Sequence, residues 1–128
     1  MNPVVVDASA LAALAFAEPS ADIVARRLQG ATVFAPTLLR FELANTAWKK
    51  IGRQPAEAAR ILTALEMVLS PRWGISWRDV DPTDVVLIAR ATGLTAYDAS
   101  YLWLAGVLGA DLVTLDTQLS RAGEIEGP

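Results

Sequence analysis

Four acidic residues, Asp7, Glu42, Asp98 and Asp116, lie in apolar or small-residue surroundings in a chain that has no histidine and no cysteine. Without imidazole or thiol groups the chain cannot build a Ser-His-Asp triad, a cysteine nucleophile or a thiolate zinc site. Carboxylates must therefore carry most of any catalysis. Clustered carboxylates repel one another by about 4 kcal/mol per pair at ~4 Å and an effective dielectric of ~20. A hard divalent cation or a shared proton would relieve that repulsion.

Strand and helix patterns alternate along the chain. A run of valines at 4–6 ends at Asp7, and a second apolar run within 111–116 ends at Asp116. Such continuous apolar runs suit strands that are covered on both faces, as in a parallel sheet. Further strands are predicted at 32–35 and, more weakly, at 75–80. The predicted helices span 10–17, 20–29, 37–51, 55–69, 82–91 and 96–108.

This alternation predicts one α/β domain over residues 1–128, with a mainly parallel central sheet of four to five strands and right-handed crossovers to helices on its faces. Four polar residues stand where helix N-caps are expected, and a side-chain oxygen at such a position accepts a hydrogen bond from the first turn. These predicted caps are Ser20, Thr37, Asp81 and Thr95.

The predicted topology brings the four acids to one edge of the sheet. Asp7 and Asp116 each close a strand at its carboxyl end, and parallel strands share that edge. Glu42 lies in the second turn of the helix that leaves the strand at 32–35. Asp98 lies in the first turn of a helix that runs back antiparallel to the strand after it. This is the edge at which open α/β sheets commonly bind ligands.

Each acid also has a structural interpretation. Asp98 follows Thr95 by three positions and could complement the helix dipole or imitate a capping box. Asp7 and Asp116 could be turn formers or N-caps of the helices that follow them. Glu42 could pair with a surface lysine. Their shared edge and apolar flanks favour the functional interpretation.

Net charge and hydropathy point to different kinds of partner. The net charge of −3 argues at first against nucleic acid, but setting the four acids aside leaves acidic and basic residues nearly balanced. Phosphate could then be attracted through a bound metal ion. The mean hydropathy of +0.35 is high and favours self-association.

The longest apolar run, at 10–17, is far short of the ~20 residues that cross a bilayer, and the N-terminus lacks a positive leader. These features predict a cytoplasmic protein without a membrane segment.

At these acids the sequence resembles the PIN-domain family, and within it the VapC toxins of bacterial toxin–antitoxin systems. The resemblance covers nearly the whole chain. It rests on four segments in order, which are Val-Val-Val-Asp7-Ala-Ser9-Ala, Arg40-Phe-Glu42-Leu-Ala-Asn45, Thr95-Ala-Tyr-Asp98-Ala-Ser-Tyr-Leu and Leu-Val-Thr114-Leu-Asp116. One departure is Leu119, which stands where relatives often have a larger aromatic residue.

The resemblance implies a PIN-like, Rossmann-like three-layer fold and a metal-dependent endoribonuclease that leaves 5′-phosphate and 3′-hydroxyl ends. It also implies an RNA substrate, a homodimer and a cognate VapB-type antitoxin whose C-terminal segment covers the active groove. The ion expected at Asp7, Glu42, Asp98 and Asp116 is Mg²⁺ or Mn²⁺, because hard oxygen ligands suit both.

The resemblance also suggests a role for each site residue. Asp7 and Asp98 are expected to hold the principal ion. Glu42 is expected to orient its water or complete its shell, and Asp116 to support a second ion bound with substrate. A separate expectation is that Ser9 and Thr114 hydrogen-bond to these ligands.

Two rival functions stay open from the sequence. One is a phosphatase or phosphoacceptor that uses Asp7 as a nucleophile at a strand end, although the common dehalogenase pattern needs a second acid where this chain has Ser9. The other is a non-catalytic PIN-like module that binds RNA or protein, since fold alone does not fix chemistry.

Overall fold

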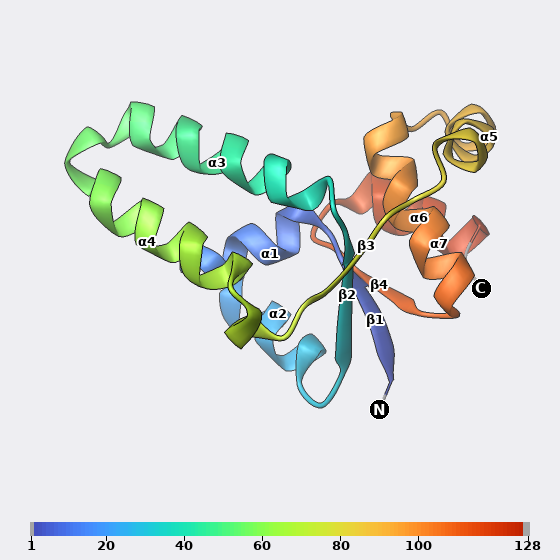
Figure 1. The fold of residues 1–128 in the computed structure, drawn as a ribbon. Helices are drawn as coiled ribbons and strands as arrows, with labels where there is room; N and C mark the ends of the chain where they lie inside the picture. The colour runs from blue at the N-terminus through green and yellow to red at the C-terminus, as the bar shows by residue number, and fades with distance from the viewer. Residues whose placement is uncertain (1, 127–128) are drawn as a thin grey trace.

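A parallel four-stranded sheet forms the centre of the computed structural model, which describes residues 2–126 (Figure 1). The strand order is β3-β2-β1-β4, and every pairing is parallel. The α/β fold predicted from the sequence, with four strands, is therefore confirmed. The strands are β1 (Pro3–Val6), β2 (Thr32–Pro36), β3 (Ser76–Arg78) and β4 (Asp111–Val113).

Helices cover the sheet on both faces and make the fold three-layered. One group, α1 to α4, lies on one side of the strands, with α3 and α4 packed together as a long pair, and α5 to α7 lie on the other side (Figure 1). The helices are α1 (Ala8–Ala15), α2 (Ala21–Leu28), α3 (Leu39–Arg53), α4 (Ala58–Leu69), α5 (Pro82–Thr92), α6 (Ala96–Leu108) and α7 (Thr117–Glu126), with short 3-10 turns at η1 (Pro55–Glu57) and η2 (Pro71–Trp73). No helix within residues 2–126 is both long and apolar enough to cross a membrane.

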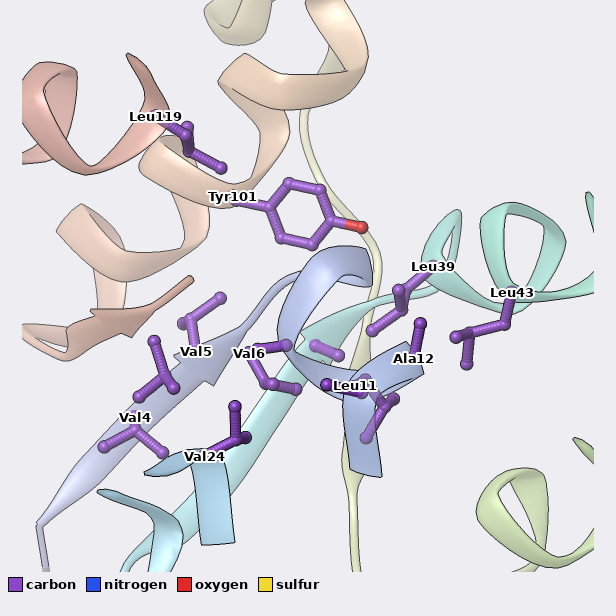
Figure 2. Close-up of a cluster of buried hydrophobic side chains, with 14 of the residues drawn as sticks. Val4, Val5, Val6, Leu11, Ala12, Val24, Leu39, Leu43, Tyr101 and Leu119 are labelled. Carbon is purple, nitrogen blue, oxygen red and sulfur yellow. The ribbon is translucent and has the colours of Figure 1, made fainter. Parts of the chain in front are cut away.

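The core is centred on β1, which lies between β2 and β4 and is covered by helices on both faces of the sheet. Val5 and Val6 are fully buried, as expected for an apolar run in a parallel sheet. Leu11 and Leu39 pack on one side, and Tyr101 of α6 lies on the other with its hydroxyl directed toward the start of α3 (Figure 2). The carboxyl end of β1 and the residue that follows it, Asp7, therefore lie in closely packed surroundings.

Three of the four predicted N-cap residues stand at the N-cap of a helix. The Asp81 side chain accepts from the first turn of α5, and the Thr95 hydroxyl accepts from the first turn of α6. Ser20 also stands at the N-cap position of α2, but its side chain makes no cap hydrogen bond. The prediction for Thr37 is wrong, because its backbone N donates to Arg78 O and extends the β2–β3 pairing, so that α3 begins only at Leu39.

The carboxyl end of β4 differs from the predicted strand at 111–116. The strand ends at Val113, because side chains take up the backbone groups beyond it. The N–H of Leu115 donates to the Ser9 hydroxyl at 2.9 Å, and the N–H of Asp116 donates to the Thr114 hydroxyl at 3.0 Å. The chain then turns into α7, a helix that the sequence analysis did not predict.

Candidate active site

Asp7 follows β1 directly and is the most enclosed of the four acids. Its carboxylate oxygen Oδ1 accepts from the Ser9 hydroxyl at 2.7 Å and from the Ala10 N–H at 3.0 Å, and Oδ2 accepts from the Thr114 hydroxyl. Asp7 is thus the N-cap of α1, as its structural interpretation allowed. The side chain is only 4% exposed, and burial raises its pKa although all three hydrogen bonds oppose the increase.

Ser9 and Thr114 join the ends of β1 and β4 around Asp7. Besides donating to Asp7, each hydroxyl accepts from a backbone N–H of the segment after β4. The predicted hydrogen bonds of both residues to a site carboxylate are therefore confirmed. These bonds fix the Asp7 carboxylate in one orientation and hold the segment that carries Asp116 beside it.

Asp116 is half-buried and caps α7. Its Oδ1 accepts from the N–H groups of Gln118 at 2.9 Å and Leu119 at 3.2 Å. Leu119 itself is 1% exposed, so the helix that Asp116 starts is anchored in the core. The charge of Asp116 raises the pKa values of Asp7 and Asp98, which places the three acids within electrostatic range of one another.

Glu42 projects from the first turn of α3, one turn earlier than predicted because α3 starts at Leu39. Its Oε1 accepts a hydrogen bond from the Tyr101 hydroxyl. Burial raises the pKa of Glu42, and the charges of Asp98 and Asp7 add to the increase, while the Tyr101 hydrogen bond opposes it. Glu42 therefore belongs to the same electronegative cluster.

Asp98 lies in the first turn of α6, as predicted. Its backbone N–H donates to the Thr95 hydroxyl at 3.1 Å, so Thr95 supplies the cap and the Asp98 carboxylate is not needed for it. Partial burial raises the pKa of Asp98, with further increases from Asp116 and Asp7. An acid that is destabilised in its charged form by burial and by two like charges is more typical of a ligand site than of a cap.

The donor chemistry of this cluster fits a hard cation, because every ionisable donor is a carboxylate oxygen. Within residues 2–126, no three acidic side chains come close enough together to hold one ion in the conformation described. Mg²⁺ is commonly held by only one or two carboxylates together with waters and substrate phosphate. The carboxylates therefore fit a partly open Mg²⁺ site. The assignment of all four acids as metal ligands stays a prediction.

The raised pKa values of Asp7, Glu42 and Asp98 predict that the metal-free protein loses stability as pH rises. An acid whose folded-state pKa exceeds its unfolded value binds more protons when folded, so the free energy of unfolding falls with pH between the two values. This pH range begins near the ordinary pKa values of 3.8 for aspartate and 4.5 for glutamate, and it ends at the raised pKa values of the folded protein. We expect the melting temperature in EDTA to fall by several degrees across it, since 1 kcal/mol corresponds to roughly 3–6 °C in a chain of this size.

Thermal unfolding monitored by circular dichroism over a pH series measures this slope. Asp98→Asn removes one titrating group and should flatten the slope, and Mg²⁺ should do the same by stabilising the charged forms. A melting temperature that instead climbs steadily from the acid limit to neutrality would contradict the electrostatic description of the cluster.

Tyr101 is a site residue within the sequence motif around Asp98, although the motif alone predicts no role for it. It is 1% exposed and the largest of the fully buried side chains. Burial and the neighbouring carboxylates raise the pKa of its hydroxyl, which therefore stays protonated and donates to Glu42. The available signal was the tyrosine itself, because a tyrosine on an otherwise apolar helix usually has a polar partner for its hydroxyl.

Comparison with known proteins identifies the class to which this fold and site belong. A family model described as the PIN domain matches residues 4–125. The chain therefore belongs to the PIN-domain family. Ribonuclease VapC3 of Pyrobaculum aerophilum is 35% identical over 121 residues, which cover 91% of this chain and 92% of that protein.

Other relatives agree with this placement. Ribonuclease VapC12 of Mycobacterium tuberculosis is 32% identical over 122 residues, covering 93% of this chain and 91% of that protein. The crystal structure of PAE2754 from Pyrobaculum aerophilum superposes with a TM-score of 0.74 at 30% identity, covering 94% of this chain and 86% of that one. Together these relatives confirm the predicted resemblance to VapC-type PIN domains.

Proposed function

We propose that this protein is a Mg²⁺- or Mn²⁺-dependent endoribonuclease of the VapC toxin type that hydrolyses RNA phosphodiester bonds. The observation that carries the proposal is the position of Asp7, Glu42, Asp98 and Asp116 at one edge of the sheet of a PIN domain, where burial and, to a smaller extent, mutual repulsion raise the pKa values of Asp7, Glu42 and Asp98. The names of the VapC ribonucleases of similar sequence support the same activity.

The roles of the side chains follow from how firmly each is held. Asp7 and Asp98 would hold the principal ion, Asp7 in the orientation fixed by Ser9 and Thr114. Glu42, held by Tyr101, would orient the attacking water, and Asp116 would support a second ion bound with substrate. When bound, such an ion makes its water more acidic and neutralises charge on the phosphoryl oxygens. No histidine is needed for this chemistry.

The phosphoacceptor alternative receives less support from the geometry. A carboxylate nucleophile needs an accessible oxygen, whereas both oxygens of Asp7 accept hydrogen bonds and the side chain is 4% exposed. A buried carboxylate of this kind is better suited to ligating an ion at its remaining lone pairs than to attacking a phosphoryl group. We therefore place Asp7 among the ligands.

The proposal includes partners and a compartment. We propose a homodimer and a cognate VapB-type antitoxin in the cytoplasm. The exposed apolar side chains of Val86 and Leu87 on α5 and Val107 on α6 are 58%, 63% and 62% exposed. Because α5 and α6 pack together, these side chains are available to a protein interface.

Sequencing of RNA 5′ ends after induced expression tests the activity and identifies the RNA that is cut. We expect new 5′-phosphate ends with the unmodified chain and none with Asp98→Asn, whose fold should be intact because Thr95 supplies the helix cap. Cleavage by the purified protein should stop in EDTA and return with Mg²⁺ or Mn²⁺. Full activity in EDTA would remove the metal from the proposal. If the protein neither cleaves RNA nor binds a divalent ion in calorimetry, the results would favour the non-catalytic module.

A further inference from the structure

One face of α3 exposes large aromatic side chains that the core does not use. Phe41 is 76% exposed and Trp48 is 70% exposed. With Asn45 between them they stand at intervals of four and three residues, which puts all three side chains on the same face of the helix. Phe41 and Trp48 are about 10 Å apart along the helix axis. The face therefore carries two exposed aromatic side chains, and Phe41 lies beside the carboxylate site.

The first part of this face borders a hollow of about 470 Å³ next to the site. Phe41 and Asn45 of α3, Glu42 of the acidic cluster, and Tyr97 of α6 all line it. Tyr97 is 67% exposed and immediately precedes Asp98, just as Phe41 precedes Glu42. The hollow contains no basic residue, so it suits an uncharged planar ring and not a phosphate.

The second part of the face combines an aromatic ring with positive charge. A neighbouring hollow of about 360 Å³ is lined by Trp48, Lys49, Gly52 and Arg53. In the part of the chain that the structure describes, the ion pairs join Lys50 to Glu18 and Arg60 to Glu57, so neither involves Lys49 or Arg53. These two cations are free to meet an external anion.

Gly52 is a further residue of α3 that lines the hollow beside Trp48. It lies inside α3, where glycine weakens a helix relative to alanine. A Cβ built at Gly52 would meet nothing within 4 Å, so packing inside the protein does not explain the residue. The hollow beside Trp48 is therefore open at this position.

We propose that this face of α3 binds single-stranded RNA on its way into the carboxylate site. One base stacks in the hollow lined by Phe41 and Tyr97, and a further nucleotide lies against Trp48 with its phosphate near Lys49 and Arg53. Stacking on aromatic rings beside basic side chains is how proteins bind unpaired strands. The inference rests on the proposed ribonuclease function and adds where the substrate outside the scissile bond is held.

The charge distribution explains why such a surface is needed. The acidic cluster repels RNA phosphates unless cations are bound there, so it contributes little affinity by itself. Aromatic rings attract every base through its π-face, and the cations lie at the far end of α3, away from the carboxylates. Lys49 and Arg53 flank Trp48, and their positive charge is complementary to the phosphate backbone of a nucleic acid.

Binding of a short, fluorescently labelled single-stranded RNA in EDTA tests the proposal by fluorescence anisotropy without cleavage. Phe41→Leu, Tyr97→Leu and Trp48→Leu keep apolar bulk but remove the ring, and each should weaken binding about 5- to 100-fold. Phe41→Tyr should retain binding. Trp73→Leu is the matched control, because Trp73 is 37% exposed but precedes the amino end of β3, at the opposite edge of the sheet. It should leave RNA binding unchanged.

Two further measurements separate stacking and charge. Tryptophan fluorescence should be quenched on RNA addition to the unmodified chain, and Trp48→Phe should remove most of that quenching. Lys49→Gln with Arg53→Gln should weaken binding and reduce its dependence on salt concentration. Because all of these side chains are exposed, the folds should be unchanged, which circular dichroism checks.

Several results would overturn the inference. Leucine variants that bind RNA as the unmodified chain does, or an unmodified chain that does not bind RNA, would exclude the binding face. Variants at Phe41 or Trp48 that dissociate a dimer in light scattering while keeping RNA affinity would assign the face to protein contact. If the unmodified chain cleaves RNA and the leucine variants bind RNA as well as it does, this inference alone is refuted. If the leucine variants lose RNA binding but the unmodified chain does not cleave RNA, only the proposed function is refuted.

Discussion

Asp7→Asn should lower the rate of RNA cleavage by two to four orders of magnitude. The amide has nearly the shape of the carboxylate but no negative charge, so it would bind a divalent ion much more weakly. Loss of several kcal/mol of transition-state stabilisation corresponds to a decrease of this size, since each 1.36 kcal/mol is a factor of ten. Single-turnover cleavage of a labelled RNA at saturating Mg²⁺ measures the change.

The fold should survive this substitution. Asparagine is as good an N-cap as aspartate, and its carbonyl can still accept from Ser9 and the Ala10 N–H. The Thr114 hydroxyl, which now donates to Asp7, can turn and accept from the amide. Removing a buried charge whose pKa is raised should leave the melting temperature in EDTA unchanged or higher. Thermal unfolding therefore distinguishes lost chemistry from lost structure.

Asp22→Asn is the matched control for the loss of one carboxylate. Asp22 is an exposed acid in the first turn of α2, so it reproduces the charge change without touching the cluster. Its cleavage rate should equal that of the unmodified chain. If Asp7→Asn also cleaved at the unmodified rate, Asp7 could not be a ligand and the proposed mechanism would fail.

The position of the acids was predictable because it depends on strand direction and little else. Val4, Val5 and Val6 read as a strand buried on both faces, and the residue after such a strand must lie at its carboxyl edge. The same logic placed Asp116 near Asp7. Binary patterns and chain direction, which are local properties, were sufficient for this part of the fold.

Other features escaped because tertiary contacts decide them. Thr37 has a good capping side chain, yet its backbone joins β3 and moves the start of α3 to Leu39. The helix α7 is polar along most of its length and becomes recognisable only once Asp116 caps it and Leu119 is buried. Local propensity was overridden in the first case and too weak in the second.

The hydrogen bond between Tyr101 and Glu42 was also not predictable, because it is a tertiary contact between two helices that are far apart in sequence. The motif around Asp98 contained the tyrosine, but nothing in the sequence paired it with an acid on another helix. Its position in the core (Figure 2) and its hydrogen bond to Glu42 give one side chain two functions. Those functions can be separated by substitution.

Tyr101→Phe should cleave RNA roughly 10- to 100-fold more slowly while remaining folded. The ring still fills its place in the core, so the packing is kept, but Glu42 loses the donor that fixes its carboxylate near the water it is proposed to orient. Positioning and proton-handling groups typically contribute effects of this size. The decrease should appear in the single-turnover rate, with RNA affinity unchanged because the exposed face of α3 is intact.

Tyr101→Ala separates the packing function from the hydroxyl. Removing a fully buried aromatic ring leaves a cavity and should lower the free energy of unfolding by about 3–5 kcal/mol, a large share of the stability of an ordinary domain. Urea unfolding in EDTA measures both variants on one scale, and Tyr101→Phe should lose at most about 2 kcal/mol. If Tyr101→Phe cleaved RNA at the full rate, the hydroxyl would serve only to satisfy a buried polar group, and Glu42 would need another residue to hold it.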